Sequence, residues 1–197
     1  MGIRSFSAAV IAAMVLFLAQ SASAQSGTVT GTVTAKGLRT NADIVVSLQA
    51  PGLKLTPPTK PIEMDQKGML FIPHVLAVIT GTTVKFLNSD PVAHNVFSPE
   101  GKYNLGTWPQ GDTKDHKYDK PGVYSQLCRV HAEMEAYVVV LDTPYFATTD
   151  KTGAFEIKNV PPGKYTVVAW SEKLKEVRQP ITVEAGKLAT VNLTLSH

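Results

Sequence analysis

Short segments rich in β-branched residues, separated by glycine and proline, are the feature that most limits the folds open to this chain. Residues 28–34 alternate threonine with apolar or small residues, which is typical of a half-buried strand. Residues 164–170 repeat the alternation, and residues 136–141 form an apolar run expected to be buried on both faces or nearly so. No segment of useful length shows the 3.6-residue apolar period of an amphipathic helix. The sequence therefore predicts an all-β protein made of β-sandwiches.

The predicted strands fall into two groups of different character. Further strands are expected at 44–48, 68–72, 75–79, 82–87, 94–97, 123–127, 154–157, 179–183 and 188–195. Residues 50–61 carry four prolines and a glycine, a density that excludes regular structure and predicts a linker. Residues 101–120 are polar and glycine-containing, which predicts a solvated loop.

The two ends of the chain resemble each other and differ from the middle. Neither end is long enough to close a sandwich alone, but two strands before the linker and four after Pro144 would complete one. We therefore expect a discontinuous domain formed by 27–50 and 145–196, with a second domain, 62–142, inserted into one of its loops.

The first 24 residues have the pattern of a secretory signal peptide. Arg4 gives a positive start, an apolar run follows, and Ala22-Ser23-Ala24 fits a signal-peptidase cleavage site. The run is too short for a span, which needs about 20 apolar residues. We expect cleavage after Ala24 and a periplasmic protein without stable membrane insertion. An uncleaved N-terminal anchor is the alternative interpretation.

The charge balance limits the partners. The chain has 19 Lys and Arg against 16 Asp and Glu, a formal net charge of +3 that falls by one when Arg4 is removed. Nucleic-acid binding needs clustered basic residues, so nucleic acid is not an expected partner. With one cysteine the chain forms no internal disulfide, and a lone cysteine in an oxidising compartment is either a liability or a site.

That cysteine stands beside two other soft or borderline ligands. Cys128, His131 and Met134 lie within seven residues. Copper accepts two His and one Cys in a plane with a weak axial Met, so the second His has to come from elsewhere. His94 is the candidate, because it follows a strand and a Pro91 turn that could aim its ring at the Cys128 loop. The neighbouring Asn95 could bridge the two ligand loops.

The middle of the chain resembles the cupredoxins. The resemblance covers about residues 64–141 and rests on a spaced motif: Gly81-x-x-Val84-x-Phe86-x-Asn88, His94-Asn95 and Pro121-Gly122-x-Tyr124-x-x-x-Cys128-x-x-His131-x-x-Met134. The short C-x-x-H-x-x-M loop is similar to that of the amicyanins. The resemblance implies a Greek-key sandwich of eight strands, one type 1 copper ion held by His94 Nδ1, Cys128 Sγ, His131 Nδ1 and Met134 Sδ, and one-electron transfer.

Two features depart from that family. Gln126 stands where many relatives carry an aromatic residue, and Glu133 and Glu135 flank Met134. A carboxylate there could alter the partner surface or compete as axial ligand. Outside the motif, His74 is expected to be a rim residue, with a role near the metal as the alternative. Trp108 could form part of a docking surface or cover the edge of the core.

The outer strands resemble the carboxypeptidase regulatory-like domain, a small transthyretin-like sandwich. This resemblance rests on Gly31-x-Val33, Thr149-Asp150-Lys-Thr-Gly153-x-Phe155 and Val160-Pro-Pro-Gly163-x-Tyr165. The resemblance implies that these strands have a structural or adhesive role rather than a chemical one. The combination of both families is similar to bacterial periplasmic proteins described as plastocyanin-like or methylamine-utilisation-like.

From these resemblances we expect a monomeric blue-copper electron carrier rather than an enzyme. Its redox partner would be a c-type cytochrome or a periplasmic dehydrogenase. Two alternatives use other features of the chain. Copper storage, delivery or sensing would use the same ligands with a more labile ion, and a surface-binding β-sandwich module would carry copper only incidentally.

Overall fold

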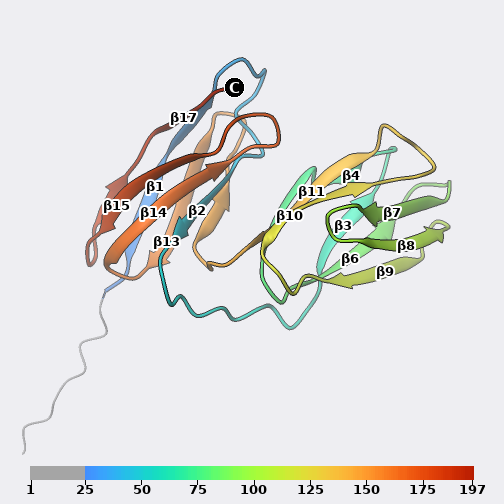
Figure 1. Ribbon diagram of the computed structural model, residues 1–197, viewed down its shortest axis with the longest axis horizontal. Coiled ribbons are helices and arrows are strands. Elements are labelled where there is room, and N and C mark those ends of the chain that lie inside the picture. Colours follow the sequence, from blue (N-terminus) through green and yellow to red (C-terminus); the bar gives the residue numbers. More distant parts are fainter. Residues whose placement is uncertain (1–24) are drawn as a thin grey trace, which may run out of the picture.

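The computed structural model describes residues 25–197, and the predicted signal peptide lies outside the described residues. The strands gather around two separate hydrophobic cores, which form two β-sandwiches lying side by side (Figure 1). The described residues contain strands and turns without a helix, as the all-β prediction requires. No helix in this part of the chain could therefore span a membrane.

We call the sandwich formed by residues 62–141 the inner sandwich. Its first sheet has five strands in the order β5-β11-β10-β7-β8, and its second has four in the order β4-β3-β6-β9. The strands are β3 (Ile62–Gln66), β4 (Phe71–Ile72), β5 (Val75–Ile79), β6 (Thr83–Asn88), β7 (His94–Ser98), β8 (Tyr103–Trp108), β9 (Thr113–Lys117), β10 (Gly122–Leu127) and β11 (Glu135–Leu141).

We call the other sandwich the outer sandwich. One sheet has the order β12-β2-β14-β15, and in the other β1 lies between β13 and the short strands β16 and β17. The strands are β1 (Gly27–Ala35), β2 (Val45–Gln49), β12 (Phe146–Thr148), β13 (Ala154–Val160), β14 (Gly163–Trp170), β15 (Val177–Val183), β16 (Leu188–Thr190) and β17 (Leu193–Leu195).

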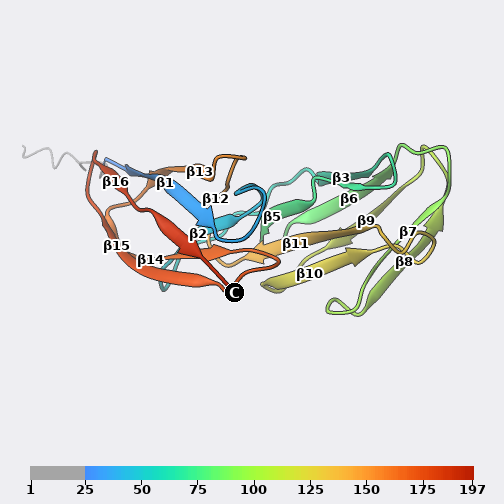
Figure 2. The ribbon, with the colours of Figure 1, turned by 90° about the horizontal axis from the view of Figure 1, so that it is seen from above.

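The outer sandwich is thus built from both ends of the described chain. Strand β1 pairs with β13 across the whole inserted segment, and Figures 1 and 2 show the blue and red strands packed together. The discontinuous sandwich expected from the sequence is therefore present, with six strands after Pro144 instead of four. The proline-rich stretch after Gln49 forms no strand before Ile62. The exact domain boundaries, 27–50, 62–142 and 145–196, remain a proposal.

Side-chain alternation explains how the two sandwiches meet. On β11, Val138 and Val140 point into the inner core, whereas Val139 points to the junction and packs with Val45 and Val75. Burying apolar side chains on both faces gives β11 the continuous apolar sequence noted above. Beside this contact lies an open cleft of about 820 Å³, which is lined by residues of both sandwiches, Val45 and Val139 among them.

The prediction of a loop at residues 101–120 is wrong. This segment forms β8 and β9, which pair with β7 and β6 respectively. Both are edge strands, and β9 exposes nearly all of its side chains, so its polar sequence reflects solvent contact rather than absence of a strand. Trp108, at the end of β8, is 2% exposed and belongs to the inner core, not to a docking surface.

Candidate metal centre

The loop from Cys128 to Met134 is fixed at both ends by a pair of neighbouring strands. Strand β10 ends at Leu127, β11 begins at Glu135, and these two residues are register partners. Within the loop the Met134 backbone N–H donates to the His131 carbonyl at 3.1 Å. Cys128 is 4% exposed and Met134 is fully buried, while His131 keeps partial access to solvent. The loop therefore presents its sulfur atoms inward and its imidazole at the surface.

His94 reaches this loop from β7. Strands β7 and β10 are neighbours through the pair Phe97 and Leu127, which brings the start of β7 alongside Cys128. The ligand atoms of His94, Cys128 and His131 all lie within 4.8 Å of one another. The two Nδ1 atoms of His94 and His131 face each other at 3.0 Å. The structure thus brings together three of the four residues selected from the sequence, although they come from segments more than 30 residues apart.

Met134 belongs to the same core cluster as Cys128. Its burial fits a thioether held inside the protein near the thiol. Glu133 is exposed, and the Glu135 carboxylate accepts a hydrogen bond from the Tyr137 hydroxyl at 2.8 Å. Neither glutamate belongs to the group of converging ligand atoms. We therefore keep Met134, and not Glu133 or Glu135, as the proposed axial ligand.

Asp90 is a site residue that sequence reasoning missed. Its Oδ2 accepts from His94 Nε2 at 2.8 Å, and its carboxylate also accepts from the backbone N–H groups of Gly68 at 2.6 Å and Met69 at 2.9 Å. Burial alone raises the pKa of Asp90, but the hydrogen bonds from Met69, Gly68 and His94 outweigh it and hold the pKa below its ordinary value. An acidic residue four positions before a candidate ligand His was the available signal.

An ionised Asp90 accepts hydrogen bonds, so His94 must carry its proton on Nε2. The lone pair of a neutral His94 ring is then on Nδ1, the nitrogen that faces His131. A carboxylate behind the far nitrogen of a ligand histidine is the arrangement that fixes ring orientation at metal sites in general. The ring nitrogen implied by the family resemblance thus matches the one directed at the cluster.

Asn95 connects the two ligand loops. Its Nδ2 donates to Gly106 O at 2.6 Å and to Asn104 Oδ1 at 2.8 Å, and its Oδ1 accepts from the Arg129 backbone N–H at 3.3 Å. Its own backbone N–H points to Cys128 Sγ at 3.4 Å. A donor at this position stabilises negative charge on sulfur. The influence of Asn95 on a metal remains a prediction.

Gln126, two residues before Cys128, is fully buried with its polar atoms paired. The Tyr103 hydroxyl donates to Gln126 Oε1 at 2.6 Å, Gln126 Nε2 donates to the Tyr124 carbonyl at 3.0 Å, and the Tyr118 hydroxyl lies 2.7 Å from that of Tyr103. Desolvation raises the pKa of Tyr103 to about 12, so the phenol stays protonated and can donate. The departure from the cupredoxin pattern is therefore a hydrogen-bonded network in this chain.

His74 lies outside the cluster. It is not among the converging ligand atoms, and it contacts the outer sandwich through Glu172, 2.9 Å from its Nε2. No local sequence pattern indicates this contact, because the two residues are 98 positions apart.

The comparisons with known proteins cover both parts of the chain. The sequence model of the carboxypeptidase regulatory-like domain matches residues 132–196, about a third of the chain, and confirms the resemblance of the C-terminal strands to that family. The match begins inside the Cys128 to Met134 loop and leaves β1 and β2 outside. No curated protein matches the chain.

Solved structures similar to this chain include a copper enzyme, a cupredoxin and an amicyanin by name. A Cu-containing nitrite reductase from Thermus scotoductus is 25% identical over 48% of this chain and 25% of its own length, with a TM-score of 0.41. A purple cupredoxin from Nitrosopumilus maritimus is 26% identical over 41% of this chain and 99% of its own, with a TM-score of 0.38. A reduced amicyanin variant is 20% identical over 49% of this chain and 98% of its own length, with a TM-score of 0.40.

This chain therefore spans about a quarter of the nitrite reductase and nearly all of each small protein. At these TM-scores the likeness by itself assigns neither a metal nor an activity. The residues of the site carry the functional argument.

Proposed function

We propose that this chain is a type 1 copper protein that carries single electrons between redox partners. The observation that supports it best is the convergence of His94, Cys128 and His131 within 4.8 Å. Two imidazoles, one buried thiol and one buried thioether form a donor set that suits copper and is poorly suited to magnesium or calcium, which prefer oxygen. One copper ion, bound by these residues and Met134, would supply a one-electron couple.

The protein's own contribution is to hold these donors still. The Cys128 to Met134 loop is closed by paired strands, and His94 is fixed by Asp90. Rigid ligands change little between two oxidation states, which favours fast electron transfer over turnover of a bound substrate. Binding requires the Cys128 thiolate, so copper uptake should release a proton and be favoured at higher pH.

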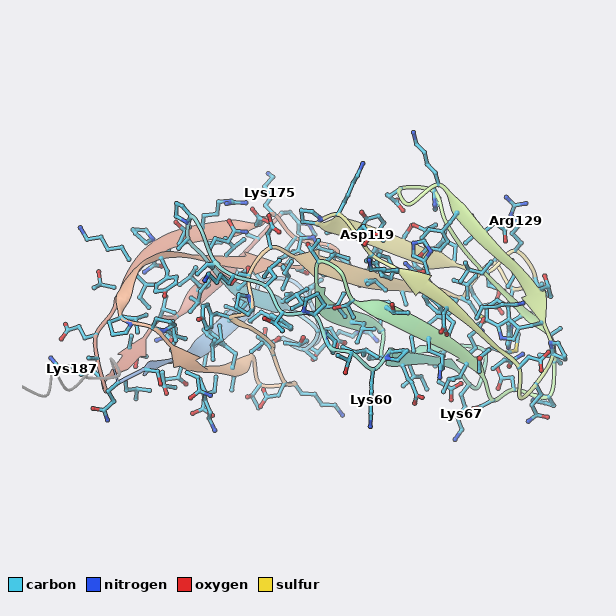
Figure 3. All side chains as sticks on the ribbon, turned by 90° about the horizontal axis from the view of Figure 1, so that it is seen from below. Lys60, Lys67, Asp119, Arg129, Lys175 and Lys187 are labelled. Carbon is cyan, nitrogen blue, oxygen red and sulfur yellow. The ribbon has the colours of Figure 1, made fainter. Side chains whose placement is uncertain are left out.

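A partner would dock where His131 reaches the surface. Large exposed apolar side chains lie on three neighbouring segments: Val130 on the Cys128 to Met134 loop, Val92 on the β6–β7 loop, and Met69, Leu70 and Ile72 on β4 and the turn before it. The Met69 N–H of that turn donates to Asp90 in the β6–β7 loop. Figure 3 shows Arg129 and Lys67, from two of these segments, at the same end of the inner sandwich. An exposed apolar patch of this kind fits a protein partner. A c-type cytochrome or a dehydrogenase in the periplasm is the proposed class.

Adding Cu(II) to the purified protein tests the assignment. We expect an intense visible thiolate-to-copper band and an EPR spectrum with small hyperfine splitting. Cys128→Ser should abolish the band, whereas His197→Gln, at a histidine outside the cluster, should retain it. A protein without the band, or a band that survives Cys128→Ser, would contradict the ligand assignment.

Redox cycling separates electron transfer from copper delivery. An electron carrier should show a reversible potential and keep its copper when reduced in the presence of a Cu(I) chelator. Release of the ion on reduction would favour the storage or delivery alternative. Val130→Glu should lower the rate of electron self-exchange between two copies without changing the spectrum, because the substitution alters only the exposed patch beside His131.

A further inference from the structure

His74 forms a hydrogen-bonded bridge between the two sandwiches. Its Nε2 lies 2.9 Å from Glu172 Oε2, in the turn after β14 of the outer sandwich. Its Nδ1 lies 3.2 Å from the backbone carbonyl of Glu135, the first residue of β11 in the inner sandwich. The imidazole therefore contacts one group from each sandwich at the same time.

Both partners of His74 are acceptors. A backbone carbonyl has no proton to donate, and the pKa of Glu172 is held below its ordinary value because hydrogen bonds from Lys173 and His74 outweigh the effect of burial. Each ring nitrogen of His74 is therefore placed to donate a hydrogen bond, one toward each sandwich.

The inner end of this bridge lies beside the candidate metal centre. Glu135 directly follows Met134, the last residue of the ligand loop. The His74 carbonyl also accepts from the Tyr137 backbone N–H at 2.9 Å, and the Tyr137 ring meets the His74 ring edge-on at 5.8 Å. Two hydrogen bonds with backbone groups therefore fix the start of β11 to His74.

Other charged groups surround this bridge. Lys173 pairs with the other oxygen of Glu172 at 2.9 Å, so both oxygens of the carboxylate have a partner. The Glu135 carboxylate is occupied by the Tyr137 hydroxyl. Asp43 and Arg39 line the same 320 Å³ pocket and offset each other in charge.

We propose that His74 and Glu172 are positioning residues through which the outer sandwich holds the C-terminal end of the ligand loop. The outer sandwich thus acts on the candidate metal centre without supplying a ligand. The role of the bridge in fixing β11 stands by itself, whereas its effect on a metal rests on the proposed function.

Hydrogen exchange and NMR of the metal-free protein test the bridge. In Glu172→Ala, the amides of Tyr137 and Met134 should exchange at least roughly fivefold faster, the change expected when about 1 kcal/mol of local stability is lost. Glu176→Ala is the matched control, because Glu176 pairs with Arg178 and lies in the same turn.

Two results would overturn the inference: equal Met134 exchange in wild type and Glu172→Ala, or an equal effect of Glu176→Ala. Glu172→Gln, which keeps the side-chain volume, should act in the same direction and serves if the alanine variant folds poorly. With copper bound, the reduction potential should change in Glu172→Ala and stay constant in Glu176→Ala. If the wild type does not bind copper, the proposed function is wrong. The hydrogen-exchange experiment still tests the bridge in that case, because it uses the metal-free protein.

Discussion

The Nε2 atom of His94 lies 2.8 Å from Oδ2 of Asp90, and both residues are buried. The carboxylate is itself held by two backbone N–H groups from the turn between β3 and β4. A turn of one sheet thereby sets the orientation of a ring on the other sheet. The ring cannot rotate without leaving a buried carboxylate partly unpaired, which costs about 1–3 kcal/mol or more for a charged group.

Replacing Asp90 with alanine should weaken copper binding by roughly 10–100-fold, the usual effect of removing the group behind a ligand histidine. The physical reason is that His94 loses both its fixed proton position and its fixed orientation. A competition titration with a chelator of known affinity measures the change. Asp112→Ala, at an exposed loop carboxylate near β9, should have no such effect. Equal affinities for all three proteins would remove Asp90 from the site.

Asn95→Ala should change the visible spectrum and the reduction potential of the copper-loaded protein. The substitution removes the side-chain bonds to Gly106 and Arg129 but keeps the backbone N–H that points to Cys128 Sγ. The thiol keeps its donor while the loop that carries it becomes less constrained. We also expect a loss of about 1–3 kcal/mol in unfolding free energy from the unpaired buried groups. Unchanged spectrum and potential would refute the bridging role.

The features that could be predicted from the sequence are those that depend on a local pattern of residues. Alternation along residues 164–170 predicted a strand, and β14 buries Tyr165, Val167 and Ala169 in the outer core as this alternation requires. The spacing of Cys128, His131 and Met134 predicted one rigid loop, because few residues separate them. His94 followed from its position after a strand and from the family motif.

What the sequence did not reveal depends on contacts between distant segments. Asp90 matters because backbone groups of Gly68 and Met69 reach it, and no local pattern records such contacts. His74 is paired by Glu172, which lies in the other sandwich. Strand β9 was missed because an edge strand exposed to solvent carries the polar composition of a loop.

Gly153→Ala should destabilise the outer sandwich by at least about 2 kcal/mol. Gly153 has a φ of +87°, and a Cβ there would lie 2.1 Å from the Val33 carbonyl oxygen, which belongs to β1 and cannot move independently. Gly52→Ala is the matched control, since Gly52 has a φ of +72° with no atom within 4 Å of its Cβ position. Urea denaturation should therefore show a small loss for Gly52→Ala and a large one for Gly153→Ala. Similar losses would mean that strain alone, without the contact to β1, sets the requirement for glycine.

Glu100 should make the stability of the inner sandwich depend on pH. Its carboxylate accepts from Ser125 Oγ at 2.7 Å, from the Ser125 N–H at 3.2 Å and from Ser98 Oγ at 3.2 Å. Burial by itself raises the pKa of Glu100, but these hydrogen bonds outweigh it and lower the pKa below its ordinary value of 4.5. The folded state therefore favours the ionised carboxylate.

The sign of the effect follows from that shift. Because the folded-state pKa is the lower one, the stabilisation is fully present above the unfolded-state pKa and is lost as the pH falls through the folded-state pKa. The stability advantage of the wild type over Glu100→Gln should thus be constant near neutral pH and shrink as the pH drops below about 4.5. The carboxylate is largely exposed, so we expect a change within about 1 kcal/mol. Urea denaturation of both proteins at pH 7 and pH 3 measures it, and an advantage that grows on acidification would show that the hydrogen bonds to Ser125 do not favour the ionised form.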